Sequence, residues 1–198
     1  MQTIPNEPDP LKLFAAWYAE AEACDAIDDH TAVALGTCGT DGQPDVRMVL
    51  LKGYDERGFV FYTNLTSSKS RQLNENPRAS LCFYWMPLEK QVRIRGSVEP
   101  VTDAEADAYF ATRPRQSQIG AWASRQSQPL EGRYELEKRI IKYGARFALG
   151  SVPRPPFWSG FRLIPDAIEF WLKMPYRLHD RLLYTRTASG WETRRLFP

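Results

Sequence analysis

Apolar residues recur with two different periods along this chain, and the change of period separates helical from extended segments. Near the N-terminus the spacing is helical, with apolar side chains at Leu11, Phe14, Tyr18 and Ala21. Asp9 followed by Pro10 is a typical helix start, an N-cap and then proline at the first helical position. The pattern predicts a helix from there to about Cys24. Residues 1–8, which are polar and proline-rich, are predicted to be disordered.

From Thr31 to Gly96 the apolar period becomes two, which is the period of a β-strand. The predicted strands are residues 31–38, 45–55, 57–64, 78–85 and 90–101. An Asp-Gly pair inside residues 39–44 is typical of a hairpin loop. Five consecutive strands with short turns predict an antiparallel meander, closed into a barrel so that its edges are paired.

The second half of the chain returns to helices and then to strands. A capping box formed by Thr102 and Glu105 predicts a helix over residues 102–113. A polar segment follows, and an amphipathic helix is predicted from about Leu130 to Leu149. Four extended segments complete the chain, at residues 158–165, 167–172, 177–186 and 191–197. The expected fold is therefore mainly β, an antiparallel barrel with helices packed outside, in one domain over residues 9–198.

Composition restricts what this domain can bind. The formal net charge of the 198 residues is only +2, so a nucleic acid is a poor candidate and local cationic clusters must recognise any anion. Three scattered cysteines and two histidines predict reduced thiols and no metal site. No segment resembles a signal peptide or is apolar over the length of a membrane span, so a cytoplasmic protein is expected. Aromatic residues make up 13%, enough to fill a core and to enclose a flat ring.

The segment "YRLHDRLLY", residues 176–184, alternates like a strand and carries a distinctive set of charges. In a strand, Arg177, His179 and Arg181 would point from the same face. Three such groups repel one another unless an anion lies opposite. The face could also be simply solvated, but the preceding apolar run "AIEFW" favours a site for an anionic ligand.

Three further clusters combine cations with hydroxyl groups. In "YTNLTSSKSRQ", hydroxyl residues precede Lys69 where a short helix is expected to start, which is a typical phosphate cradle. In "RMVLLK", Arg47 and Lys52 bracket an apolar strand. In "YFATRPRQSQIGAW", Tyr109 and Arg113 lie four residues apart on a helix and Ser117 follows a turn. Each cluster alone could be a solvated surface, but together they favour a site that binds two phosphate groups.

These motifs, with "FWSGFRL" and "RLHDRLLY…RRLFP", closely resemble the pyridoxamine (pyridoxine) 5′-phosphate oxidases from about Asp9 to Pro198. The resemblance implies an antiparallel FMN-binding split β-barrel that forms a homodimer, with FMN in clefts between the subunits. It implies that the flavin is held by Arg47, Met48, Val49, Leu50, Tyr62, Thr63, Ser68, Lys69, Gln91, Gln126, Ser127, Trp171 and Arg181. It implies that the substrate phosphate is held by Lys52, Tyr109, Arg113 and Ser117, with Arg177 and His179 as catalytic residues against the pyridine ring.

The implied reaction oxidises pyridoxamine or pyridoxine 5′-phosphate to pyridoxal 5′-phosphate with dioxygen, releasing hydrogen peroxide and, from the amine, ammonia. This chain departs from the family pattern at Ser68, where an arginine is usual, and at Leu172 and Lys173, where Gln-Gly is usual. Ser68 is expected to weaken FMN binding, and Leu172 and Lys173 are expected to shift flavin affinity or substrate preference. Two alternatives stay open: a non-catalytic module that binds FMN or pyridoxal phosphate, and a related split-barrel reductase, against which the "RLHDR" motif argues.

Overall fold

The computed structural model describes residues 3–198, and its main element is a nine-stranded sheet in which every pairing is antiparallel. The strands are β1 (Ala32–Cys38), β2 (Pro44–Leu50), β3 (Gly53–Asp55), β4 (Gly58–Asn64), β5 (Arg78–Trp85), β6 (Lys90–Pro100), β7 (Trp158–Leu172), β8 (Asp180–Thr187) and β9 (Gly190–Arg195). Their order is β2-β1-β5-β6-β7-β4-β3, with β8 on β7 and β9 on β8. The predicted mainly β class is confirmed.

The sheet curls because its longest strand bends. Prediction placed two strands at residues 158–165 and 167–172, whereas β7 runs unbroken through Pro165. The register between β6 and β7 shifts at Arg95/Gly96, and such an irregularity bends a strand pair. Glycine is needed at position 96, because a Cβ there would lie 1.9 Å from the Ile164 carbonyl oxygen. One half of β7 therefore pairs with β4 and the other half with β8.

The sheet is a curled half-barrel, not the closed barrel that was predicted, and a second break brings its two ends toward each other. Residues 45–55 were predicted as one strand, but β2 ends at Leu50 and β3 begins at Gly53. Between them the Lys52 N–H donates to the Val60 carbonyl of β4 at 2.8 Å. This bond draws the β2 end of the sheet toward β4, so the sheet wraps around an apolar core.

Helix α1 (Pro10–Glu22) closes one side of that core, as the sequence predicted. The Asp9 side chain accepts the Leu11 N–H, and Phe14 is fully buried with its ring 5.0 Å from the Phe59 ring. Disorder was predicted for residues 1–8, of which 1–2 lie outside the described residues. For residues 3–8 the prediction is wrong, because Ile4 is 1% exposed and belongs to the main core cluster.

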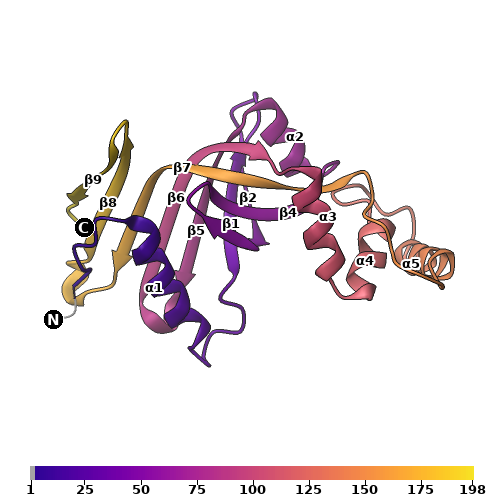
Figure 1. Cartoon of the computed structure of the whole chain (residues 1–198), viewed down its shortest axis with the longest axis horizontal. Helices are drawn as coiled ribbons and strands as arrows, with labels where there is room; N and C mark the ends of the chain where they lie inside the picture. The colour runs from indigo at the N-terminus through magenta and orange to yellow at the C-terminus, as the bar shows by residue number, and fades with distance from the viewer. Residues whose placement is uncertain (1–2) are drawn as a thin grey trace.

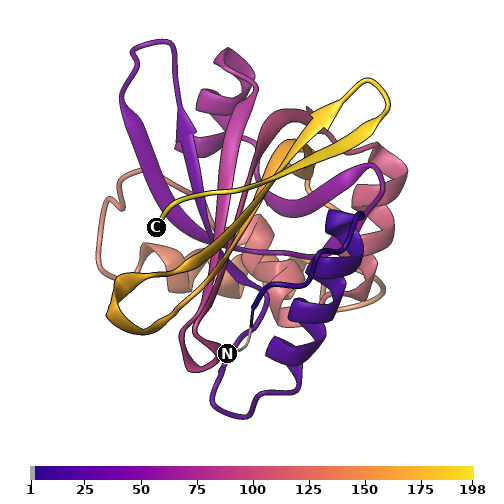
Figure 2. The same ribbon diagram turned by 90° about the vertical axis from the view of Figure 1, so that its left-hand side faces the viewer.

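The remaining helices are α2 (Ser68–Glu75), α3 (Asp103–Thr112), α4 (Arg115–Ala123) and α5 (Glu135–Arg146). Helix α4 forms where a polar connector was expected, and α5 is shorter than the predicted helix from Leu130 to Leu149. Helices α3–α5 gather at one end of the molecule and the β8–β9 hairpin lies at the other (Figure 1). Figure 2 looks onto the hairpin end, where α1 lies beside it. Within residues 3–198, no helix is long and apolar enough to cross a membrane.

Candidate functional site

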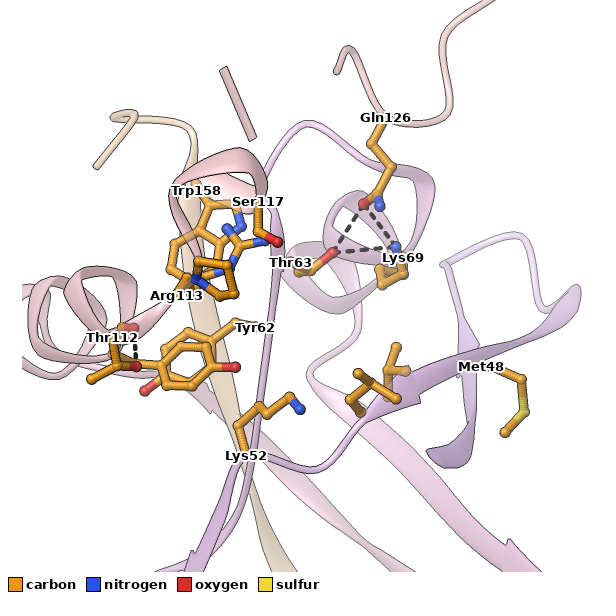
Figure 3. A pocket seen from close by; sticks show the side chains of 14 residues that line it. Met48, Lys52, Tyr62, Thr63, Lys69, Thr112, Arg113, Ser117, Gln126 and Trp158 are labelled. Carbon is orange, nitrogen blue, oxygen red and sulfur yellow. Dashed lines mark hydrogen bonds between the residues drawn. The ribbon is translucent and has the colours of Figure 1, made fainter. Parts of the chain in front are cut away.

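A cavity of about 510 Å³ opens where the end of β2 meets β4, α2, α3 and α4 (Figure 3). Its lining residues are Met48, Val49, Leu50, Lys52, Tyr62, Thr63, Lys69, Tyr109, Thr112, Arg113, Pro114, Ser117, Gln126 and Trp158. Three of these carry a positive charge, and none of the lining residues within 3–198 is a carboxylate. The cavity therefore has a positive potential and favours an anionic ligand.

Lys69 lies on one side of this cavity and is 7% exposed. It belongs to the first turn of α2, whose N-cap is the buried Ser67, close to the predicted helix start. Its ammonium donates to Thr63 Oγ1 at 3.2 Å, Ser67 Oγ at 3.3 Å and Gln126 Oε1 at 3.0 Å. Burial lowers the pKa of Lys69 and the charge of Arg47 lowers it further, while Asp45 opposes them. A buried cation whose three acceptors are all uncharged suits a bound phosphate.

Arg113 lies in the elbow between α3 and α4, on the other side of the cavity. Pro114 ends α3, because the residue before a proline avoids helical dihedrals, and Arg113 has ψ 145°. The Arg113 guanidinium lies 4.8 Å from the centre of the Trp158 ring. Its buried Nη1 has no hydrogen-bond partner among the described residues, and burial lowers the pKa of this group. Such an atom is a vacant donor for an anion.

Aromatic rings form the cavity wall next to Arg113. Tyr62, Tyr109 and Trp158 come from β4, α3 and β7 and stack nearly parallel, with 4.2 Å between the centres of the two tyrosine rings. Ser117, in the first turns of α4, lies beside Arg113, and Lys52 extends toward the space between the Arg113 and Lys69 sides (Figure 3). Trp158, Thr112 and Pro114 were not predicted as site residues; only the spatial arrangement reveals them.

Three residues predicted for the flavin lie near the cavity without lining it. Arg47 pairs with Asp45 and donates to Thr37 Oγ1, and it acts on Lys69 through its charge. Ser68 accepts a hydrogen bond from Arg71 Nη2 at 3.2 Å. Ser127 is exposed and has a left-handed φ of 67°, next to the inward-reaching Gln126.

A second group of predicted residues lies elsewhere on the chain. Gln91, Trp171 and Arg181 are register partners across β6, β7 and β8, so their side chains share the outer face of the sheet. The His179 ring lies 4.5 Å from the Trp171 ring, and Arg181 pairs with Glu169 at 2.8 Å. None of the four lines the cavity. Of the two unusual residues beside them, Leu172 is buried and Lys173 pairs with Glu89 at the surface.

The predicted strand over residues 176–184 is wrong at its start. The segment Pro175–Arg177 forms a 3₁₀ turn, and β8 begins only at Asp180. Tyr176 and Arg177 have left-handed φ values of 58° and 62°, which cost about 1–2 kcal/mol each for residues with a Cβ. The inference that Arg177 and His179 share a strand face with Arg181 therefore fails. The chain must reverse from β7 into β8 here, and a tight turn carries both residues.

The turn nevertheless holds the His179 ring in one orientation. Its Nδ1 accepts the Met174 N–H at 3.2 Å. A neutral imidazole bonded in this way carries its proton on Nε2 and can donate from that atom. Arg177 is exposed, so its guanidinium is free to meet a ligand from outside the chain.

Comparison with known proteins adds independent findings. Residues 19–146 match a family model described as pyridoxamine 5′-phosphate oxidase, and residues 158–198 match one described as the pyridoxine 5′-phosphate oxidase C-terminal dimerisation region. A pyridoxine/pyridoxamine 5′-phosphate oxidase of Caulobacter vibrioides is 58% identical over 193 residues, covering 98% of this chain and 86% of that protein. One of Mesorhizobium japonicum is 56% identical, covering 96% of this chain and 93% of the relative.

Among solved structures, PhzG of Burkholderia lata, in complex with tetrahydrophenazine-1-carboxylic acid, superposes with a TM-score of 0.91. It is 33% identical, and the match covers 98% of this chain and 94% of PhzG. A pyridoxamine 5′-phosphate oxidase-related, FMN-binding protein of Nostoc punctiforme has a TM-score of 0.76 at 16% identity, over 97% of this chain and 100% of that one. At that identity the likeness concerns the fold alone, and it confirms the split barrel.

Proposed function

The chain belongs to the pyridoxamine 5′-phosphate oxidase family, and from this premise we propose that it is an FMN-dependent oxidase of pyridoxamine or pyridoxine 5′-phosphate. The amine substrate, dioxygen and water would give pyridoxal 5′-phosphate, ammonia and hydrogen peroxide. The alcohol substrate and dioxygen would give pyridoxal 5′-phosphate and hydrogen peroxide. The observation that carries the proposal is one cavity with a cationic group on each of two sides, the buried Lys69 and the half-buried Arg113, and no lining carboxylate among the described residues.

The Lys69 side of the cavity fits a flavin mononucleotide. Its ammonium, together with Thr63 and Gln126, would hold the flavin phosphate, and the β2 segment Met48–Leu50 would border the ring system. When bound, the flavin would supply the redox chemistry, namely hydride removal from the exocyclic carbon of the substrate and electron transfer to dioxygen. The protein's contribution is to bind and orient both molecules.

The Arg113 side fits the phosphate of the substrate. The vacant Nη1 of Arg113 would gain a charged partner, and Ser117 and the Tyr109 phenol would supply further donors. Lys52, which extends toward the cavity, would add a second cation. A phosphate held here would place the pyridine ring between the Arg113 and Lys69 sides, toward the proposed flavin site.

The second group of predicted residues would complete the site from a second subunit. On one chain these residues do not line the cavity, yet the outer sheet face that carries them exposes apolar side chains, including Val46 at 66%, Met48 at 62% and Tyr84 at 55%. The match of residues 158–198 to a dimerisation region supports a homodimer. In this arrangement Gln91, Trp171 and Arg181 of one subunit border the flavin held by the other.

Arg177 and His179 would then act on the substrate bound to the other subunit. The exposed guanidinium of Arg177 can stabilise negative charge on the substrate hydroxyl or ring. His179, held through Nδ1, presents its Nε2–H as a donor toward the same ring. No side chain is assigned as the general base.

Purified protein incubated with FMN, pyridoxamine 5′-phosphate and dioxygen tests the proposal. We expect hydrogen peroxide, ammonia and pyridoxal 5′-phosphate in equal amounts. Protein that binds flavin and pyridoxal phosphate tightly but forms no peroxide would instead be a non-catalytic binding module. Turnover of a non-phosphorylated tricyclic carboxylate in preference to pyridoxamine 5′-phosphate would contradict the role given to Arg113.

The lowered pKa of Lys69 predicts how flavin binding depends on pH. Phosphate binding favours the ammonium form of Lys69. The affinity for FMN is therefore complete below the pKa that Lys69 has in the ligand-free protein, and it is lost as the pH rises above that pKa. Burial and Arg47 lower that pKa, so the loss should begin below the usual lysine value of about 10.4. Fluorescence titration of the apoprotein with FMN between pH 7 and pH 10 measures it. Lys69→Arg stays charged throughout this range, so its affinity for FMN should vary less with pH. Identical pH dependences in the two proteins would contradict the role of Lys69 in binding the phosphate.

Ser68 offers a gain-of-affinity test. The Arg71 guanidinium already donates to Ser68 Oγ and to the Thr66 carbonyl, so one cation borders this loop. Ser68→Arg adds a second at the first residue of α2 and should tighten FMN binding by about tenfold, which is the scale of one charge-assisted hydrogen bond. Ser68→Gln, which is long but uncharged, is the matched control. An unchanged dissociation constant for FMN in Ser68→Arg would mean that this loop does not contact the phosphate.

A further inference from the structure

The N-terminal strap, residues 3–8, is attached to the far end of the chain. Ile4 donates its N–H to Asp180 Oδ2 at 2.8 Å, and its carbonyl accepts Arg195 Nη2 at 2.6 Å. Arg195 Nη1 also donates to Asp180 Oδ1 at 2.6 Å. The Ile4 side chain, 1% exposed, packs into the main core. Asp180, the first residue of β8, thus connects the strap to Arg195, the last residue of β9.

A second contact holds the other end of the strap. The Tyr184 hydroxyl donates to the Glu7 carbonyl at 2.5 Å, and Tyr184 is fully buried. Burial, with a contribution from Glu7, raises the pKa of Tyr184 to about 12, so the phenol stays protonated and keeps donating near neutral pH. The strap therefore runs alongside β8 before it enters α1 (Figure 1).

The position of Asp180 gives the strap a consequence for the site. Asp180 directly follows His179 and ends the turn that carries Arg177. This turn has little packing of its own, since Tyr176 is 91% exposed and Leu178 is 68% exposed. It also contains two residues with left-handed φ, a conformation that persists only when the surrounding structure holds it. Its internal bonds include Leu178 N–H to the Pro175 carbonyl at 3.1 Å and Met174 N–H to His179 Nδ1.

We propose that the N-terminal strap and Asp180 are positioning elements, which fix the turn carrying Arg177 and His179 in the geometry that the substrate requires. Asp180 does not line the cavity; it acts through the backbone of the adjoining turn. The inference rests on the proposed function for its effect on turnover. Its structural part, that the strap orders the turn, stands independently. A misplacement of about 1 Å can cost up to about a hundredfold in rate, so a loose turn has a measurable effect.

Two variants weaken the strap near the turn. Asp180→Asn places an amide donor against the Ile4 N–H or Arg195, and deletion of residues 1–5 removes both backbone bonds of Ile4. Tyr184→Phe is the matched control, because it removes only the bond to Glu7 at the other end. Each variant is compared with the unaltered protein in kcat and KM for pyridoxamine 5′-phosphate, in the dissociation constant for FMN, in the thermal midpoint, and in hydrogen exchange of residues 174–179.

For Asp180→Asn and the deletion we expect kcat to fall about tenfold, the FMN dissociation constant to stay within about twofold, and exchange in residues 174–179 to accelerate. Tyr184→Phe should lower the thermal midpoint while kcat stays within about twofold. The proposal would be overturned if Tyr184→Phe lost as much kcat as Asp180→Asn at the same loss of thermal stability. It would also be overturned if Asp180→Asn kept the kcat of the unaltered protein. If the unaltered protein oxidises no pyridoxamine 5′-phosphate, the proposed function fails; the hydrogen exchange then decides alone, and unchanged exchange overturns the strap's role.

Discussion

Replacing Arg113 by methionine should raise the thermal midpoint of the ligand-free protein by about 2 °C and lower kcat/KM for pyridoxamine 5′-phosphate by about 100-fold or more. The two effects have opposite signs for one reason. The Arg113 guanidinium is half-buried, its Nη1 has no partner among the described residues, and burial lowers its pKa. An unsatisfied buried donor costs about 1–3 kcal/mol in the empty protein, and the same atom becomes a charge-assisted donor when a phosphate arrives.

Methionine is the right replacement because it keeps apolar contact with the Trp158 ring, over which the guanidinium lies at 4.8 Å. Differential scanning calorimetry and peroxide-coupled kinetics measure the two effects. Arg115→Met is the control: Arg115 is the next arginine, but it donates to the Gly150 and Phe147 carbonyls and does not line the cavity. It should lower the midpoint and leave KM for the substrate nearly unchanged.

Non-phosphorylated pyridoxamine separates phosphate recognition from general damage. If Arg113 binds the phosphate, Arg113→Met should lose most of its activity with the phosphorylated substrate, whereas any activity of the unaltered protein with pyridoxamine should change little. Equal losses with both substrates, or a lower midpoint in the ligand-free variant, would contradict the assignment.

Local patterns in the sequence were enough to predict much of the scaffold. The alternation in residues 31–38 and 78–85 reappears as β1 and β5, because those strands bury one face and expose the other. The start of α2 beside Lys69 followed from a hydroxyl-rich run after a strand, which is a local capping signal. Lys69, Arg113 and Ser117 were placed in one site by resemblance, and the structure brings all three to one cavity.

Features set by tertiary contacts could not be predicted in this way. The continuity of β7 through Pro165 depends on the register shift opposite Gly96, which no local pattern in residues 158–172 reveals. The turn at Tyr176 and Arg177 has the alternation of a strand, yet the chain must reverse there. The burial of Ile4 depends on Asp180 and Arg195, nearly the whole chain away, so a short polar segment was misinterpreted as disordered.

Arg177→Ala is expected to have the second large effect, a loss of kcat of about 100-fold or more with the FMN dissociation constant changed by less than about threefold. Flavin binding should change little because Arg177 belongs to an exposed turn that does not line the cavity on its own chain. Steady-state kinetics and flavin titration of the apoprotein measure the two quantities. Lys173→Ala is the control, because Lys173 precedes the same turn but pairs with Glu89. Equal losses of turnover and of flavin binding in Arg177→Ala would contradict the placement against the substrate.

Mixing the two inactive variants tests whether one site is built from two subunits. In a mixed dimer of Arg113→Met and Arg177→Ala chains, a shared site puts both substitutions into one active site and leaves the other intact. Random assembly of equal amounts makes half of the dimers mixed, so about a quarter of the unaltered activity should return. If each chain holds Arg113 and Arg177 in its own site, every site carries one substitution and no activity returns. The separation of the Arg113 cavity from the β8–β9 end on a single chain favours the first outcome.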